Sequence, residues 1–276
     1  EPAWDSPWGP GRPGWHIECS AMSMKYLGET LDIHGGGQDL VFPHHENEIA
    51  QSEGATGKPF ANFWTENGMV TTGGDKISKS TGTGSLFYVD EIAARTDPEV
   101  VRYYLLSTHY RSPIEFNEER LAEAAVAHQR LRGGLERAGA WGTGPLPEPA
   151  GALGEAVAEC ARLFREAMDD DFNSAGAIGQ LSRLSSRLNR ALEEGDPGAA
   201  SAARSLLELG RVLGLFWREP GAESWPAEVL AVVEERERAR RERDWARADA
   251  LRRRLLEEFG VVVEDVRGQA PRLKRR

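Results

Sequence analysis

The spacing of the apolar residues changes near residue 117, and this change constrains the fold more than any other feature of the sequence. Before it, residues 1–110 carry short apolar runs between turns and are rich in Gly, His and aromatic residues. After it, apolar residues recur at helical spacing, as in Leu181, Leu184 and Leu188. The first pattern favours an α/β layer, and the second favours packed helices.

In the first part, two short strands are predicted around a glycine turn. Residues 32–34 and 39–42 are predicted to be strand ends, and Gly35, Gly36 and Gly37 form the turn between them. A helix is predicted from His44 to Ser52, after Pro43, and another strand over 64–70. This alternation of strand and helix is typical of an α/β layer.

The second part is predicted to be helical from residue 117. Asn117 is a good N-cap, because acidic residues follow it in the first turn. A linker rich in Pro and Gly occupies 142–151. The helices expected here cover residues 117–140, 152–168, 174–194 and 199–216.

A small α+β piece is predicted at the C-terminal end. One helix runs from Pro226 to about Arg243, and Asp244 caps a second helix that ends at Gly260. Residues 261–263 are three valines in a row, which predicts a buried strand. The apolar face of the second helix is expected to consist of Trp245, Ala248, Leu251, Leu255 and Phe259.

The charge is distributed unevenly along the chain. The net charge is -10, but residues 228–276 hold 14 Lys and Arg against 11 Asp and Glu. An acidic body with a basic end suggests that one part meets a polyanion, although a solvated helix with internal ion pairs explains the same composition. No apolar run is long enough for a membrane span. The two cysteines, Cys19 and Cys160, cannot form a disulfide framework and suit a reducing cytosol.

One set of residues has metal-binding chemistry. His44 and Glu48 are four residues apart and share a helix face, and Cys19 can reach them across a turn. Thiolate, imidazole and carboxylate all suit Zn²⁺. The order His-His-Glu-Asn-Glu over 44–48 is not the His-Glu-x-x-His motif of metalloproteases, so a zinc hydrolase is not supported. The alternative is a small buried Cys19 and histidines on a helix surface.

The glycine turn and a lysine-rich segment are the other two candidates. Gly35 to Gly37 permit positive φ and close approach of a ligand, and Asp39 could accept hydrogen bonds from a ribose; an ordinary surface turn is the alternative. The chain has 34 Lys and Arg but only five Lys, two of which are Lys76 and Lys79. A glycine-flanked loop that carries lysines can close over a polyphosphate, but an ordinary solvated loop explains the same sequence equally well. The segment is not a Walker P-loop.

In this order, these segments resemble the class I aminoacyl-tRNA synthetases, and most closely the cysteinyl-tRNA synthetase family. Lys-Ile-Ser-Lys-Ser at 76–80 is similar to the class signature Lys-Met-Ser-Lys-Ser, with Ile77 in place of Met. The resemblance covers essentially the whole chain. The segments closest to motifs of this one family are 14–22, 32–37, 42–48, 170–173 and 244–265.

The resemblance implies roles for the candidate residues. Cys19, His44 and Glu48 match three of four zinc ligands, and the zinc would bind the thiolate of the substrate cysteine. Trp15 would pack on the cysteine. The resemblance implies that Lys79 contacts ATP and that Lys76 is a supporting charge. Gly36, Gly37 and Asp39 match the adenosine side of the site, and Mg²⁺ is expected with the ATP.

Two departures from the family pattern bear on activity. The His-Ile-Gly-His type signature is absent, and the chain begins with Glu1 inside a loop. We therefore expect a missing N-terminal segment that carries the fourth zinc ligand, and a chain that is inactive in adenylation by itself. The last residues also lack the Trp expected near 268–273, which concerns a detail of anticodon reading.

The resemblance implies ATP-dependent attachment of cysteine to tRNA(Cys) through cysteinyl-adenylate, by a cytoplasmic monomer. The fold expected is part of a Rossmann-type catalytic domain at 1–116, a helical tRNA-binding domain at 117–220 and a small anticodon-contacting domain at 221–276. Two alternatives remain. One is a non-catalytic tRNA-binding fragment, and the other is a ligase that joins cysteine to an amino sugar, against which residues 226–276 argue.

Overall fold

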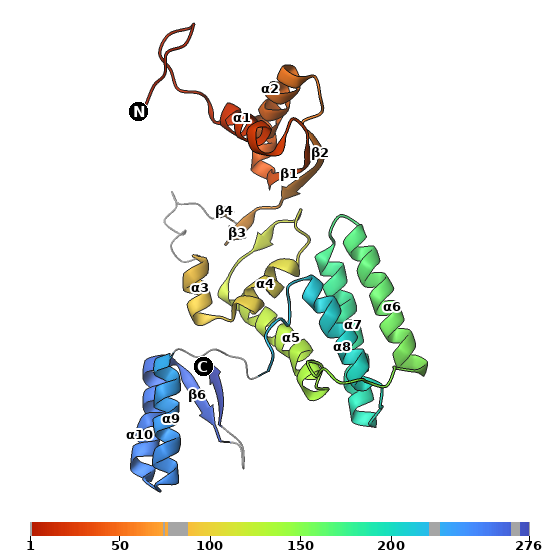
Figure 1. The fold of residues 1–276 in the computed structure, drawn as a ribbon, viewed down its shortest axis with the longest axis vertical. Coiled ribbons are helices and arrows are strands. Elements are labelled where there is room, and N and C mark those ends of the chain that lie inside the picture. The colour runs from red at the N-terminus through yellow and green to blue at the C-terminus, as the bar shows by residue number, and fades with distance from the viewer. Residues whose placement is uncertain (1, 74, 77–87, 221–226, 266–270, 276) are drawn as a thin grey trace. The chain divides into compact units, whose positions relative to one another are not determined.

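A computed structural model describes residues 2–73, 75–76, 88–220, 227–265 and 271–275 (Figure 1). The chain divides into two compact units, Glu1–Phe216 and Trp217–Arg276. Among the described residues, no helix is both long and apolar enough to cross a membrane.

The first unit begins with a βαβ arrangement, as the alternating pattern predicts. The parallel strands β1 (Leu31–Gly37) and β2 (Ala61–Asn67) pair directly, and α2 (Glu46–Thr56) connects them. Helix α1 (Trp15–Leu27) precedes β1 and packs against α2. Parallel strands need such a crossover, which explains why helix-forming residues separate them.

The glycine turn predicted at 35–37 is wrong, and so is the strand at 39–42. The three glycines form the C-terminal half of β1 and pair with residues 65–67. The chain then continues as a 3₁₀ turn, η1 (Gln38–Leu40), and a π-helical turn, η2 (Val41–His45), which leads into α2. None of the three glycines has positive φ.

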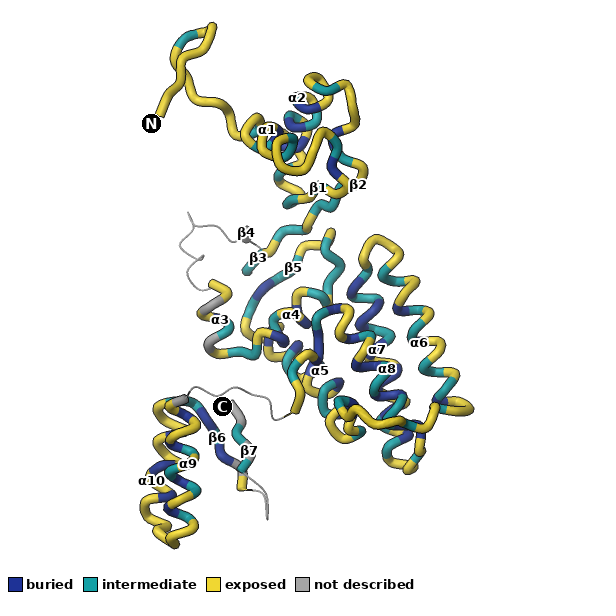
Figure 2. Tube along the Cα trace, in the orientation of Figure 1, coloured by how far each residue is buried: buried dark blue, intermediate teal, exposed yellow. Residues whose placement is uncertain are grey.

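One face of the β1–β2 sheet is covered and the other is open. His34 and Trp64 are neighbours in register and lie on the side of α2. Ile33 and Phe63, the adjacent register pair, are 60% and 69% exposed. Since parallel sheets are usually covered on both faces, this open apolar face is unusual. Figure 2 shows exposed and partly buried stretches along β1 and β2.

A small three-stranded sheet and two helices lie between this layer and the bundle in the sequence. The strand predicted at 64–70 is divided between the end of β2 and the start of β3. Gly68 lies between the two strands, and no larger residue fits there because a Cβ would collide with the backbone of Ser112. The elements of this segment are β3 (Val70–Thr72), β4 (Asp75–Lys76), α3 (Val89–Arg95), α4 (Pro98–Leu106) and β5 (Ile114–Glu115).

Four helices then form the bundle, close to the predicted bounds. The side chain of Asn117 accepts a hydrogen bond from the Arg120 amide, which confirms the predicted cap. Leu181, Leu184 and Leu188 are fully buried, as their spacing predicts. The last helix ends earlier than predicted, because Gly214 and Phe216 adopt positive φ. The helices are α5 (Glu118–Arg137), α6 (Gly151–Asp169), α7 (Ser174–Glu194) and α8 (Ala199–Val212).

The second unit is the predicted α+β piece. Asp244 caps α10 by accepting from the Arg247 amide, and Gly260 ends it in the left-handed conformation. Trp245, expected on the apolar face, is 59% exposed, while Leu251 and Leu255 are buried against Val261 and Val263. The elements are α9 (Ala227–Arg241), α10 (Trp245–Phe259) and the antiparallel strands β6 (Val261–Glu264) and β7 (Arg272–Arg275).

Candidate functional site

The three predicted metal ligands converge from three elements of the first unit. Cys19 comes from α1, His44 from η2 and Glu48 from α2. One ligand atom of each lies within 4.8 Å of the others. The packing of α1 against α2, which no short-range spacing could indicate, brings Cys19 to the other two.

The carboxylate of Glu48 is the centre of this cluster. It is fully buried, and its two oxygens face different histidines. Oε2 lies 2.7 Å from Nε2 of His34 in a hydrogen bond. Oε1 lies 2.7 Å from Nε2 of His44, yet it accepts no hydrogen bond. A buried carboxylate oxygen without a hydrogen bond is costly unless it binds something else.

This unpaired oxygen makes the cluster fit a metal ion. With Nε2 of His44 unprotonated, its lone pair would face Oε1 of Glu48 over 2.7 Å, and a cation bound by both atoms would replace that repulsion with two bonds. Burial, followed by the negative charge of Glu48, raises the pKa of the Cys19 thiol, and a cation would oppose both effects. Burial lowers the pKa of His44, which favours the neutral ring that a metal requires.

Two aromatic neighbours fix the orientation of His44. Its Nδ1 lies 2.8 Å from Nδ1 of His16. If Nε2 keeps its lone pair for a metal, Nδ1 carries the hydrogen and donates it to His16. The ring of Trp15 lies 4.3 Å from that of His44, centroid to centroid, and is 58% exposed. The predicted cysteine-side residue therefore borders the predicted metal ligands.

Sequence reasoning missed a second histidine layer beneath the cluster. His34, His45 and Glu48 also bring ligand atoms within 4.8 Å of one another. Nδ1 of His45 lies 2.9 Å from Oε1 of Glu66 on β2. The signal was available in part, because His34 alternates with Ile33 along a strand and therefore faces the other side of the sheet.

The glycines of β1 are close to protein atoms and leave no free space there. A Cβ on Gly36 would lie 2.8 Å from Nε2 of His45, and one on Gly37 would lie 2.5 Å from a carboxylate oxygen of Asp39. Asp39 is exposed in η1, directly after the strand. The need for glycine here thus comes from packing, while the ATP-side role of these residues stays a prediction.

The two predicted catalytic lysines differ in what the structure describes. Lys76 belongs to β4, whose backbone pairs with Thr71 of β3. Lys79 lies outside the described residues. Their role stays a prediction.

A polar network joins the β1–β2 layer to the helical bundle. Gln38 donates to the carbonyl of Arg111 at 2.8 Å, and Arg111 donates to the carbonyl of Trp64 at 3.4 Å. The guanidinium of Arg111 also holds both oxygens of Asp171, whose carboxylate accepts from the Tyr110 hydroxyl at 2.6 Å. Asp171 lies within the 170–173 motif identified from the sequence, so the motif has a structural role.

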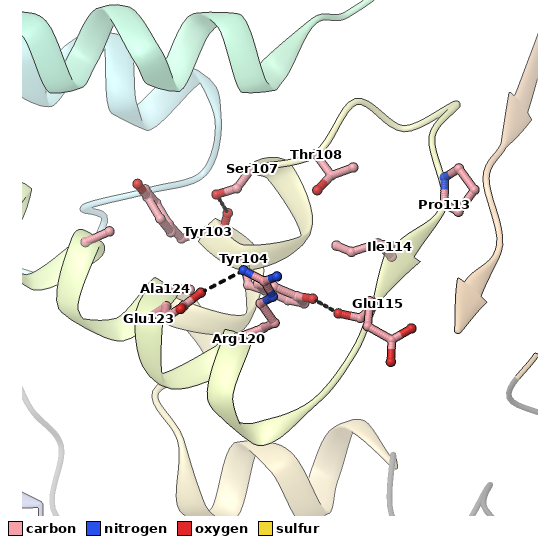
Figure 3. A pocket seen from close by; sticks show the side chains of 11 residues that line it. Tyr103, Tyr104, Ser107, Thr108, Pro113, Ile114, Glu115, Arg120, Glu123 and Ala124 are labelled. Carbon is pink, nitrogen blue, oxygen red and sulfur yellow. Dashed lines mark hydrogen bonds and ion pairs between the residues drawn. The ribbon is translucent and has the colours of Figure 1, made fainter. Parts of the chain in front are cut away.

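A separate pocket of about 370 Å³ lies between α4, β5 and α5 (Figure 3). Tyr103 and Tyr104 line it, and an ion pair between Arg120 and Glu123 lies at its edge, with a distance of 3.1 Å. The Tyr104 hydroxyl donates to the carbonyl of Glu115. None of the predicted site residues that the structure describes lines this pocket, so we place the chemistry at the histidine cluster.

Three family profiles match the chain in succession. They are described as the tRNA synthetases class I (C) catalytic domain, the DALR domain and the cysteinyl-tRNA ligase anticodon binding domain. The residues matched are 1–126, 163–217 and 222–270, respectively.

Curated relatives match along nearly the whole chain. A protein named cysteine–tRNA ligase from Geobacter sulfurreducens is 49% identical over 298 residues, covering 99% of this chain and 60% of the relative. One of the same name from Ectopseudomonas mendocina is 50% identical over 276 residues, covering 97% of this chain and 57% of the relative. The chain thus spans about 60% of the length of such relatives.

A solved structure supports the fold alone. The ternary complex of Agrobacterium radiobacter agnB2 LeuRS with tRNA and LeuAMS matches with a TM-score of 0.55 and 17% identity, over 77% of this chain and 32% of that chain. The predicted class I synthetase fold, an incomplete α/β layer followed by helical domains, is confirmed. The three profiles and the curated relatives show that the chain belongs to the cysteinyl-tRNA synthetase family.

Proposed function

We propose that this chain serves the ATP-dependent attachment of cysteine to tRNA(Cys) through cysteinyl-adenylate, as part of a longer synthetase. The observation that carries the proposal is the convergence of Cys19, His44 and Glu48 around a buried carboxylate oxygen that lacks a hydrogen bond. A site of this composition suits the recognition of a thiol substrate, which is what distinguishes cysteine from serine.

On the cysteine side, Cys19, His44 and Glu48 would hold Zn²⁺ together with the fourth ligand expected from the missing N-terminal segment. When bound, the ion supplies a soft Lewis acid that prefers a thiolate to a hydroxyl. His34 and His16 keep Glu48 and His44 oriented through their hydrogen bonds. Trp15, half-exposed beside His44, would cover the substrate side chain and exclude water.

On the ATP side, we assign Lys79 and Lys76 to the phosphates and the Gly36, Gly37 and Asp39 segment to the adenosine. Mg²⁺ would accompany the nucleotide. The support is the Lys-Ile-Ser-Lys-Ser sequence at 76–80 and the position of Asp39 directly after the carboxyl end of a parallel strand, the usual edge for a nucleotide.

On the tRNA side, we assign residues 117–220 to the body of the tRNA and residues 221–276 to the anticodon, with a catalytic part at 1–116. The anticodon-binding profile at 222–270 supports the last assignment. It also disfavours a ligase for amino sugars, which has no need of such a domain. We further propose that the protein acts as a monomer in the cytoplasm.

Metal analysis of the 276-residue chain and its C19S and E48Q variants tests the cysteine side. After zinc loading and dialysis against a weak chelator, the unaltered chain should retain one zinc ion and the variants markedly less. With Co²⁺ in place of Zn²⁺, a thiolate charge-transfer band should be present and should grow on adding cysteine but not serine.

The matched control is C160S, because Cys160 is buried in the helical bundle and remote from the cluster. This variant should keep both the zinc and the Co²⁺ band. Equal zinc retention by the unaltered chain and C19S, or an equal response to cysteine and serine, would overturn the proposal.

A further inference from the structure

Helix α7 has an unusual charge pattern for a chain with a net charge of -10. From Ser174 to Leu192 it contains three arginines and no acidic residue; its two glutamates, Glu193 and Glu194, stand at its C-terminal end. Helix α6, its neighbour in the bundle, carries both signs of charge along its length. The basic character therefore distinguishes α7 from α6.

The three arginines share one exposed face of α7. Arg183, Arg187 and Arg190 follow a spacing of four and three residues and are all exposed. The opposite face carries the buried leucines of the bundle core, so the rotation of the helix is fixed. At 1.5 Å per residue, the three charges extend over roughly 10 Å along the helix.

None of these arginines has an ion pair or hydrogen bond with another described residue. Elsewhere in the bundle, the exposed Arg162 pairs with Glu166 at 2.7 Å and the partly buried Arg132 pairs with Glu136 at 2.9 Å, while Arg165 and Arg211, which have no partner among the described residues, belong to no such row. Like charges one turn apart destabilise a helix slightly. An unpaired row therefore suggests that its partner is another molecule.

Helix α5 extends the basic surface alongside α7. Arg137 donates to the side chain of Asn189 at 2.7 Å, and a Cβ on Gly134 would lie 3.1 Å from the same side chain. The two helices are thus in close contact next to the arginine row. Arg130, one turn before Gly134, is also exposed. Small residues lie on or beside the exposed face of α7, with Gly179 and Ser182 before Arg183 and Ser186 between Arg183 and Arg187.

We propose that this surface, the α7 arginine face (Arg183, Arg187 and Arg190), binds the sugar–phosphate backbone of tRNA. The inference rests on the proposed function, because it takes tRNA as the substrate. A repeating row of phosphates matches a repeating row of unpaired guanidinium groups, and small side chains let a backbone approach. The anticodon-binding profile that follows at 222–270 makes tRNA a better occupant than an acidic protein.

The test compares tRNA binding by the 276-residue chain and its R183Q/R187Q/R190Q variant over a range of KCl concentrations. Each lost phosphate contact should reduce the slope of log K against log salt by about 0.7–0.9. We expect the slope to fall by roughly 2–3 and the affinity at moderate salt to fall at least about tenfold. Because the contacts involve the backbone, tRNAs of different sequence should lose the same factor.

The control variant, R162Q/R165Q/R211Q, removes the same charge from exposed positions on α6 and α8. It should bind tRNA within about twofold of the unaltered chain, and circular dichroism should show equal helix content in all three proteins. Unchanged affinity and slope in the α7 variant, or equal losses in both variants, would overturn the α7 assignment alone. Failure of the unaltered chain to bind tRNA would overturn the proposed function and this inference together.

Discussion

At the scale of single residues, Glu48 is held from one side only. His34 donates to one of its oxygens, and the other oxygen faces His44 without a hydrogen bond. Removing a carboxylate from water is costly, and the hydrogen bond from His34 offsets part of that cost. The arrangement keeps one oxygen positioned and unoccupied, as a ligand for a metal ion requires.

Gly36 is required by this arrangement, and Gly36→Ala tests the requirement. A Cβ would lie 2.8 Å from Nε2 of His45 and push the ring away from Glu66. We expect a loss of about 1–3 kcal/mol in the free energy of unfolding, measured by urea denaturation. Gly54→Ala is the control. It lies in α2 with no atom within 4 Å of its Cβ, and it should gain up to about 1 kcal/mol.

The sequence predicts half of this cluster. Helical spacing relates His44 to Glu48, but the contacts of His34 and His16 with them depend on how a strand and a neighbouring helix pack. Such contacts join residues 14 and 28 positions apart, and no local pattern encodes them. Cys19 entered the set because a thiolate suits zinc and could reach the other two across a turn, and the packing of α1 against α2 places it there.

At the scale of elements, the helices were predictable and the β1–η2 segment was not. In long periodic segments such as α7, apolar residues recur at helical spacing and so indicate the buried face at every turn. Residues 39–42 have the composition of a strand, but they form η1 and the start of η2. The preceding glycines take the strand position instead, because Thr65, His45 and Asp39 leave room only for glycine there.

Asn117→Ala tests the cap that both sequence and structure assign to α5. The side chain of Asn117 accepts from the Arg120 amide at 2.9 Å, and alanine cannot replace that acceptor. Loss of such a cap costs about 1 kcal/mol. The melting temperature of the first unit should therefore fall by roughly 2–4 °C in a thermal scan followed by circular dichroism.

Asn117→Ser is the matched variant for this cap, because serine also accepts a hydrogen bond at the N-cap. Its melting temperature should stay close to that of the unaltered chain. If the serine and alanine variants melt together, the hydrogen bond to Arg120 contributes little.

At the scale of the first unit, Asp171 connects the strand layer to the bundle. The guanidinium of Arg111 donates to the carboxylate of Asp171 and also to the carbonyl of Trp64. The ring of Trp64 packs on that of His34. Displacement of the 170–173 segment would thus move Arg111 and disturb Trp64, which contacts His34 of the histidine cluster. The sequence marks this segment as a motif, but its partner lies 60 residues earlier and only the fold reveals it.

The ionisation of Asp171 reports on this connection. The hydrogen bond from Arg111, followed by that from Tyr110, lowers the pKa of Asp171 to about 2. Because the pKa is lower in the folded chain, the ion pair stabilises the fold above the ordinary aspartate pKa and is lost as the pH falls towards 2. NMR titration of the side-chain carboxyl carbon should show Asp171 ionised at pH values where ordinary aspartates are protonated.

Arg111→Gln should return the pKa of Asp171 towards its ordinary value in the same NMR titration. Arg162→Gln, which removes an exposed arginine paired with Glu166 on α6, should leave it unchanged. If the pKa of Asp171 were the same in the Arg111→Gln variant as in the unaltered chain, the ion pair between Arg111 and Asp171 would not be the cause of the low pKa.

The open face of the β1–β2 sheet has a calorimetric consequence. Unfolding raises the heat capacity only by the apolar surface that it newly exposes to water. Ile33 and Phe63 on this face, and Phe42 and Trp8 outside the sheet, are exposed while the chain is folded, so their hydration is already present before melting. The heat-capacity increment of the first unit should therefore lie below the roughly 12–15 cal/mol/K per residue of ordinary globular domains. Binding of any polypeptide that covers this face should therefore be accompanied by a negative change in heat capacity.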